Sequence, residues 1–319
     1  MFTRDRALFG WRAAWANSAP LAATSVLMLA AFVASAAGIF LDPREITGFP
    51  AWLKPAKFAI STAIYSATLA WMFQYISVWR RFVRAMGWVI ASVLILEVAI
   101  IDVQAWRGTT SHFNAATTED LVLFGIMGTA IGVLWLASVG ILAALFRQRF
   151  DDVTWGWAVR LGMLVTVLGS AAGGMMIRMT PEQAEAARVN HTATIVGAHT
   201  VGAPDGGPGL PGVGWSTLHG DLRVPHFFGL HGVQVIPFLA WVFGRRREWV
   251  FAIAASYLTF TGILFWQAMR GQSITEPDGA TLTALGVWLA ATAAMLASLW
   301  TKAPPAHWRR FDSPPLSRR

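Results

Sequence analysis

The chain has 319 residues, of which 55% are hydrophobic and 13% are charged, and its formal net charge is +8. A soluble globular domain carries about 25% charged residues, so this composition excludes a disordered chain and argues against an ordinary water-soluble domain. The chain contains no cysteine, which excludes disulfides, thiolate zinc sites, iron–sulfur clusters and thiol nucleophiles. A metal ion or haem would therefore need His, Met or carboxylate ligands.

Eight apolar blocks follow one another along the chain, and each has about the 20 residues that a helix needs to cross a bilayer. The expected spans are residues 20–41, 54–78, 84–106, 120–146, 156–179, 224–244, 248–269 and 280–300. Tryptophan falls near many of their ends, as in the aromatic belt of a membrane protein. The sequence therefore predicts an all-α membrane protein with eight transmembrane helices.

The first of these blocks has a second interpretation. Ala34-Ser35-Ala36 fits the small-residue cleavage site of a signal peptide. The apolar run and the segment before it are both long for such a peptide. We therefore expect residues 20–41 to stay in the protein as its first span, with cleavage as the alternative.

Lysine and arginine indicate the orientation. They are concentrated in the N-terminal segment 1–19, the even-numbered loops and the basic tail 301–319, and the odd-numbered loops carry fewer. Because cytoplasmic loops are enriched in these residues, we expect a multi-pass protein of a bacterial-type plasma membrane with both termini in the cytoplasm. Membrane orientation also explains the net positive charge, so nucleic acid is not an expected partner.

The longest predicted outer loop comprises residues 180–222. It opens with Thr180-Pro181-Glu182-Gln183, a capping box with proline at the first helical position, which predicts a short helix that ends near Asn190. Glycine and proline dominate residues 197–214. Because no Gly-Lys-Ser/Thr follows, a nucleotide-binding P-loop is excluded, and we expect a flexible surface loop, with a lid as the alternative.

Short patterns of the first half recur in the same order in the second half. For example, Gln104-Ala105-x-Arg107-Gly108 recurs as Gln267-Ala268-x-Arg270-Gly271. The order predicts a tandem duplication of a four-helix unit, residues 20–146 and 156–300, with the extra residues of the second copy in the loop 180–222. Since each unit has an even number of spans, the two copies would point in the same direction.

Ionisable side chains inside a membrane helix are functional candidates because burying them is costly. Glu97 lies near the middle of the third span and His231 at a similar depth in the sixth, so we predict that they form a catalytic pair at the repeat interface. His219, Asp221 and His226 precede His231 on the outer side, and these four residues are the candidate metal ligands. The alternative is that each histidine is an interhelical hydrogen-bond donor without a catalytic role.

Five further polar residues are expected to line the site of a substrate or cofactor: Lys57, Asp102, Arg107, Gln234 and Arg270. Lys57 and Asp102 lie at similar depths on neighbouring spans, so a purely structural ion pair is the alternative for them. Arg107 and Arg270 occupy equivalent repeat positions and favour interface anchors over anion ligands. His112 lies in a polar loop, where a solvated histidine is expected, and Pro237 is expected to kink the sixth span near His231.

The arrangement of two four-helix units is similar to that of haem A synthases, which hold haem through histidines on the second and fourth spans of each copy. Here the second, fourth and eighth spans contain no histidine, and no Glu-x-x-His motif opens the second. The resemblance is one of architecture and implies no site residue. We therefore expect a metal ion in preference to haem.

The polar groups favour the outer half of the predicted bundle, whereas a transport path needs polar lining on both sides of the membrane midplane. This favours a metal- or cofactor-dependent membrane enzyme whose His/carboxylate site faces the outside. A small-molecule transporter is the first alternative, and a membrane assembly or structural factor is the second. The expected partners are the lipid bilayer and a small-molecule or lipid ligand.

Overall fold

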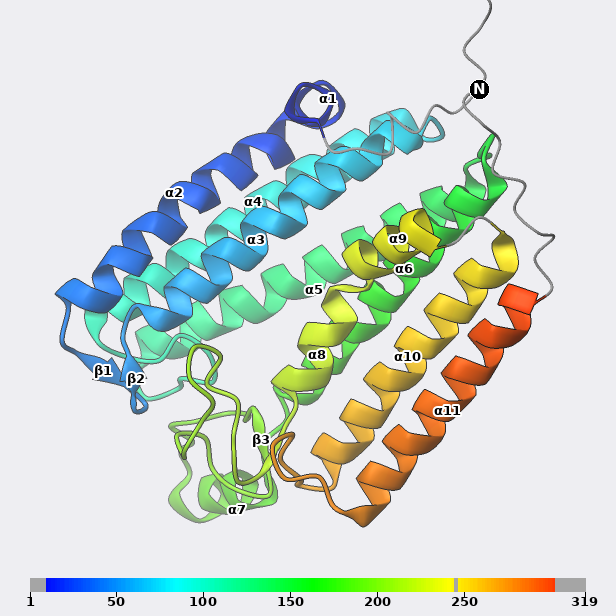
Figure 1. The fold of residues 1–319 in the computed structure, drawn as a ribbon. Coiled ribbons are helices and arrows are strands. Elements are labelled where there is room, and N and C mark those ends of the chain that lie inside the picture. The colour runs from blue at the N-terminus through cyan, green and yellow to red at the C-terminus, as the bar shows by residue number, and fades with distance from the viewer. Residues whose placement is uncertain (1–9, 244–245, 302–319) are drawn as a thin grey trace, which may run out of the picture.

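The computed structural model describes residues 10–243 and 246–301, and most of these residues are helical (Figure 1). The helices are α1 (Trp11–Asn17), α2 (Ala19–Leu41), α3 (Leu53–Met72), α4 (Arg80–Arg107), α5 (Thr118–Arg147), α6 (Val153–Ala172), α7 (Pro181–Asn190), α8 (Arg223–Leu230), α9 (Gly232–Phe243), α10 (Arg247–Met269) and α11 (Gly279–Thr301). Short 3-10 turns, Phe73–Tyr75 and Gly173–Met175, extend α3 and α6. Residues 1–9 of the predicted N-terminal segment and residues 302–319 of the predicted tail lie outside the described residues.

Six of the described helices are long and apolar enough to cross a membrane: α2, α4, α5, α6 with its 3-10 turn, α10 and α11. The pair α8 and α9 makes a seventh candidate if this bent pair is one span. The chain is thus an all-α, multi-pass membrane protein. α3, the remaining predicted span, packs along α2 and α4 (Figure 1), but Lys54, Lys57 and several hydroxyl side chains lower its hydropathy.

The sixth predicted span is broken at His231, between α8 and α9, and the two helices meet at an angle of 49°. The break lies close to the place where Pro237 predicts a kink. Thr166 of α6 stabilises it from the side: its hydroxyl donates to the Leu230 carbonyl (3.0 Å) and accepts from the Val233 amide (2.8 Å). One side chain therefore pairs a backbone group from each side of the break.

α6 and α8 approach each other backbone to backbone. Gly169 of α6 faces Gly229 of α8, and a Cβ atom on either residue would collide with the backbone of the other. Small residues at helix interfaces allow this close packing in membrane proteins. The contact fixes the position of α8, which carries His226.

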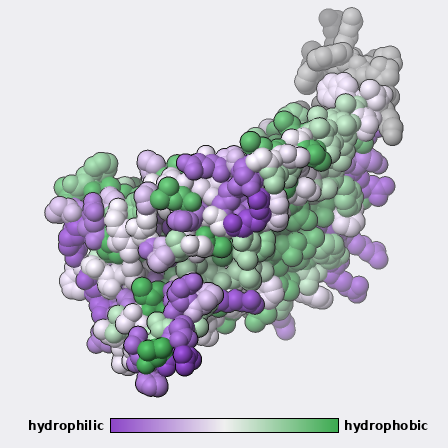
Figure 2. Space-filling model, turned by 90° about the horizontal axis from the view of Figure 1, so that it is seen from below, coloured by the Kyte–Doolittle hydropathy of each residue, from purple (hydrophilic) through white to green (hydrophobic). Residues whose placement is uncertain are grey.

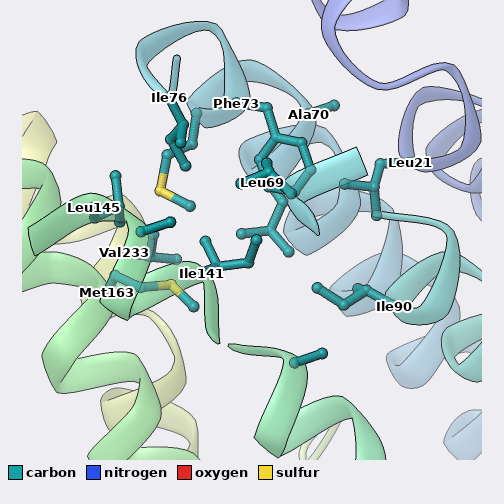
Figure 3. Close-up of a cluster of buried hydrophobic side chains, with 14 of the residues drawn as sticks. Leu21, Leu69, Ala70, Phe73, Ile76, Ile90, Ile141, Leu145, Met163 and Val233 are labelled. Atoms are coloured by element: carbon teal, nitrogen blue, oxygen red, sulfur yellow. The ribbon is translucent and has the colours of Figure 1, made fainter. Parts of the chain in front are cut away.

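A buried apolar cluster joins the two halves of the chain (Figure 3). Leu21, Leu69, Ile90 and Ile141 come from α2, α3, α4 and α5, and the second half contributes side chains that include Met163 of α6. The cluster lies near the end of the bundle where α2 and α4 begin. The acidic side chains that are buried among the described residues, Glu97, Asp120 and Asp221, lie toward the opposite end.

At that opposite end lies the long segment between α6 and α8, together with α7 (Figure 1). The predicted capping box is confirmed: the Thr180 hydroxyl accepts from the Gln183 amide, and the Gln183 side chain accepts from the Thr180 amide, both at 3.2 Å. Two short antiparallel strand pairs also lie here: β1 (Glu45–Ile46) with β2 (Phe49–Pro50), and β3 (Thr200–Val201) with β4 (Gly220–Asp221). Figure 2 shows hydrophilic residues gathered at this end and hydrophobic residues along the flank of the helices.

Candidate functional site

Three ionisable side chains meet where α3 begins beside α4. Lys54 Nζ lies 2.9 Å from His112 Nδ1, and His112 Nε2 lies 3.3 Å from Glu97 Oε1. Glu97 is only 3% exposed, and among the described residues neither of its carboxylate oxygens accepts a hydrogen bond of good geometry. Because the Lys54 ammonium can only donate, its contact leaves Nε2 of His112 as the protonated nitrogen, facing Glu97.

His112 reaches this position because the segment between α4 and α5 folds back onto α4. Gly108 ends α4 with a φ of 76°, in the left-handed region that suits glycine. The Thr109 amide donates to the Gln104 carbonyl (3.0 Å), and the Gln104 side chain donates to the Thr110 carbonyl (3.4 Å). A short connection that folds back in this way carries His112 toward α3.

The expectation of a solvated His112 is wrong, since its side chain is 21% exposed. Its ring packs beside Phe58 and Phe113, with ring centroids 5.6 and 6.1 Å away. Burial lowers the pKa of His112 well below its ordinary value, and the charge of Lys54 and the nearby His199 act in the same direction. The ring is therefore neutral at pH 7, with one nitrogen that accepts and one that donates.

A second histidine lies on the other side of Phe113. The His199 ring centroid is 4.8 Å from that of Phe113, and His199 Nδ1 is 2.7 Å from Asp205 Oδ2. Burial alone would raise the pKa of Asp205. Hydrogen bonds from the His199 ring and from the His199 and Thr200 amides have the larger opposite effect, and together they hold the pKa of Asp205 well below its usual range. Asp205 is therefore ionised and anchors this part of the loop.

Lys57 and Arg223 hold the same loop from the side of α3 and α8. Lys57 Nζ donates to the Val213 carbonyl (2.7 Å), and Arg223 Nη2 donates to the Gly214 carbonyl (2.5 Å). Arg223 also pairs with buried Asp221 through Nε and Nη2 at 2.5–3.2 Å. We refer to the following eight residues as the outer cluster: Lys54, Lys57, Glu97, His112, His199, Asp205, Asp221 and Arg223.

The predicted partners of Glu97 make their contacts elsewhere. His231 lies at the α8–α9 break with its ring 4.4 Å from that of Phe227, and none of the described contacts joins it to Glu97. His226 is hydrogen-bonded through Nδ1 to the Gly169 carbonyl at 2.8 Å. Both histidines therefore have partners of the kind expected for interhelical hydrogen bonding and packing.

The four candidate metal ligands, His219, Asp221, His226 and His231, do not assemble. No group of three or more His, Asp or Glu side chains in residues 10–243 and 246–301 is arranged to hold a metal ion. One reason is that His226 and His231 are five residues apart, which corresponds to about 140° around a helix. The other is that Arg223 occupies both carboxylate oxygens of Asp221.

The predicted polar lining is divided between separate places. The alternative Lys57–Asp102 ion pair is not among the contacts of the described residues. Lys57 donates to a loop carbonyl instead, and one carboxylate oxygen of Asp102 has no hydrogen-bond partner there. Gln234 of α9 donates to the Thr68 hydroxyl of α3 (3.2 Å), and both residues are half-buried. Of the ten residues predicted for the site, Glu97, Lys57 and Asp221 lie in the outer cluster.

The two repeat-equivalent arginines tie consecutive helices together. Arg107 contacts Asp120 (2.8 Å) and Glu119 (3.3 Å) at the start of α5. Arg270 pairs with Asp278 before α11 and packs on the Trp266 ring at 4.5 Å. Both sets of contacts fit the interpretation of these arginines as anchors.

Sequence reasoning missed five members of the outer cluster: Lys54, His112, His199, Asp205 and Arg223. One signal was available, since the chain has only three lysines and two of them, Lys54 and Lys57, open α3. No protein-family model matches the chain, and neither curated proteins nor solved structures include a match to it. The geometry of the outer cluster is therefore the basis for a functional assignment.

Proposed function

We propose that the chain crosses a bacterial-type plasma membrane eight times, as two tandem four-helix repeats with both termini in the cytoplasm. The loop 180–222 then lies outside, and so does the outer cluster. α3 is the eighth span in this arrangement because it packs along α2 and α4, which are both apolar enough to cross the membrane.

Equivalent backbone turns support the repeats, residues 20–146 and 156–300. The Gln104 side chain donates to the carbonyl six residues later at 3.4 Å, and the Gln267 side chain does the same at 2.8 Å. The glycines that follow, Gly108 and Gly271, both have left-handed backbones with φ of 76° and 73°. The same motif thus closes α4 and α10 in the same way.

We further propose that the protein is a membrane enzyme that transfers a proton at the outer cluster, with His112 as the general acid–base. The observation that carries this proposal is the chain of contacts from Lys54 through His112 to Glu97. A neutral histidine has one ring nitrogen that accepts a proton and one that donates a proton, which are the two functions of a general acid–base. A carboxylate behind the imidazole stabilises the cation that forms when the ring takes up a proton.

The location of the polar groups favours an enzyme over a transporter. The outer cluster lies at one end of the bundle, and the opposite end is filled by fully buried apolar side chains that include Leu69, Ile90 and Ile141. A polar path through the bundle would have to cross this cluster. A transporter is therefore the second candidate, and uptake into proteoliposomes would identify it.

The test is substrate discovery by mass spectrometry. The purified protein in lipid nanodiscs is incubated with a pooled small-molecule extract, and consumed and produced compounds are compared among variants. We expect turnover by the wild type and by His191→Asn, which changes an exposed histidine of the same loop, and loss of turnover in Glu97→Gln and His112→Gln. Equal turnover by all four proteins, or turnover by none, would contradict the proposal.

Metal analysis and a visible spectrum of the same preparation test the predicted cofactor. A stoichiometric metal or a haem band would show that ligands outside the described groups complete a site. Loss of that metal in His231→Ala would then support His231 as one of the predicted ligands.

A further inference from the structure

The two lysines of the outer cluster have no acidic partner of their own. Lys54 and Lys57 are half-buried on consecutive turns at the start of α3, and neither has a carboxylate within 4.0 Å among the described residues. The first turn of α3 also contains no acidic residue. Like charges three residues apart on a helix repel each other, so this arrangement opposes folding unless a negative charge is nearby.

A third cation is part of the same region. Lys54 and Lys57 both lie within electrostatic range of Arg223. The acidic groups that face these cations are already engaged: Asp221 is paired with Arg223, and Glu97 acts on Lys54 across His112. Lys57 is consequently the cation with the least compensation.

Two of these cations donate hydrogen bonds to backbone carbonyl oxygens. The carbonyls of the consecutive residues Val213 and Gly214 accept from Lys57 and Arg223, respectively. Gly212 and Gly214 permit this backbone path, because their φ angles of 76° and 68° lie in the left-handed region. Lys57 and Arg223 therefore each bind an oxygen acceptor, and the two acceptors belong to consecutive residues.

We propose that Lys57, Arg223 and Lys54 bind the phosphate group of the substrate, whose oxygens replace the carbonyl oxygens of Val213 and Gly214. The inference rests on the proposed function, since it names the substrate class of the same site. Lysine and arginine are the side chains that proteins use for phosphate. Bound in this way, the phosphate group would lie beside His112 and hold the rest of the substrate near the proton-transfer group.

The test is a titration of the full-length protein in zwitterionic nanodiscs with inorganic phosphate, followed by calorimetry and by hydrogen exchange. We expect saturable binding and faster exchange of the amides of residues 208–217, because the carbonyls that hold this segment are displaced. Lys57→Gln removes one charge-assisted contact and is expected to weaken binding by about tenfold or more. Lys57→Arg is expected to restore most of the affinity.

Arg188→Gln is the matched control. Arg188 lies on α7 of the same loop, its side chain is 73% exposed, and it pairs with Glu185, so its loss changes the net charge equally without touching the site. Affinity within about twofold of the wild type is expected, because an exposed charge at a distance is screened. Equal weakening by Lys57→Gln and Arg188→Gln, or no saturable binding by the wild type, would overturn the inference.

The titration also separates the possible sources of the phosphate and the two proposals. Repeating it in nanodiscs with phosphatidylglycerol at high salt, where the repulsion between phosphate and the anionic surface is screened, shows whether a lipid headgroup competes. A weaker apparent affinity than in zwitterionic nanodiscs at the same salt concentration assigns the site to a phospholipid, and an unchanged affinity assigns it to a soluble phosphate compound. Glu97→Gln is expected to bind phosphate normally while turnover is lost. Phosphate binding without any turnover would contradict the enzyme proposal alone, and turnover that is insensitive to Lys57→Gln would contradict the phosphate site alone.

Discussion

Replacing Thr166 by valine tests how the broken span of α8 and α9 is held. Thr166 is fully buried, and its hydroxyl pairs with the Leu230 carbonyl and the Val233 amide. The last carbonyls of one helix and the first amides of the next have no partner within their own helices. The Thr166 hydroxyl therefore replaces hydrogen-bond partners that the Leu230 carbonyl and the Val233 amide would have in an unbroken helix.

The expected loss follows from these two bonds. A hydrogen bond contributes about 0.5–1.5 kcal/mol net, and a buried polar group left unpaired costs about 1–3 kcal/mol. Valine has nearly the same volume and shape, so the cavity contribution is small. We expect Thr166→Val to lower the free energy of unfolding by about 2–4 kcal/mol.

The assay is reversible unfolding in mixed micelles, followed by circular dichroism. Thr129→Val is the matched control, because the Thr129 hydroxyl is exposed and donates to the Gly125 carbonyl of its own helix; a change within about 0.5 kcal/mol is expected there. If Thr166→Val also changed the free energy of unfolding by no more than this control, the hydroxyl would not be holding the break, and the reasoning would be refuted.

Three further predictions concern packing, pH and topology. Gly229→Ala should lower the free energy of unfolding by about 1–3 kcal/mol or more, because the added methyl group overpacks the contact with α6. Gly128→Ala is the control, since its methyl group meets open space. Equal effects of the two substitutions would contradict the close approach of α6 and α8. NMR of the ring nitrogens should find His112 neutral well below pH 6.5. Because the unfolded chain takes up this proton near the ordinary histidine pKa of 6.5, the free energy of unfolding should fall as pH drops through 6.5. Titration of His112 at pH 6.5 in the folded protein would show a solvated ring. Reporter fusions at Arg246 and near Gly206 should lie on opposite sides of the membrane, and the same side for both would overturn the span count.

Features encoded over a short stretch of sequence were predicted well. The helix positions follow from apolar blocks separated by basic loops, and the helix α7 follows from four consecutive residues that include Thr180 and Gln183. Glu97 was singled out because an acid within an apolar helix is costly. Its partner was not, because depth along a helix axis says nothing about which neighbouring element faces the side chain.

His112 shows the limit most clearly. The contact between Lys54 and His112 joins residues 58 positions apart and depends on a connection that folds back onto α4. Periodicity describes helices and gives no path for such a connection. The predicted metal ligands do not come together among the described residues for a local reason: Arg223, two residues after Asp221, pairs with both oxygens of that carboxylate.

The apolar cluster of Figure 3 makes the two halves of the chain one folding unit. It is built from α2 to α5 on one side and from α6 and α9 on the other, so neither half can complete it alone. If the chain were cut between Arg147 and Val153, the first fragment would carry Ile141 and the second would carry Met163. Each fragment alone would leave its part of the cluster uncovered. We therefore expect coexpressed fragments to reassemble through the packing of this cluster, whereas a single fragment would leave its cluster side chains in contact with lipid.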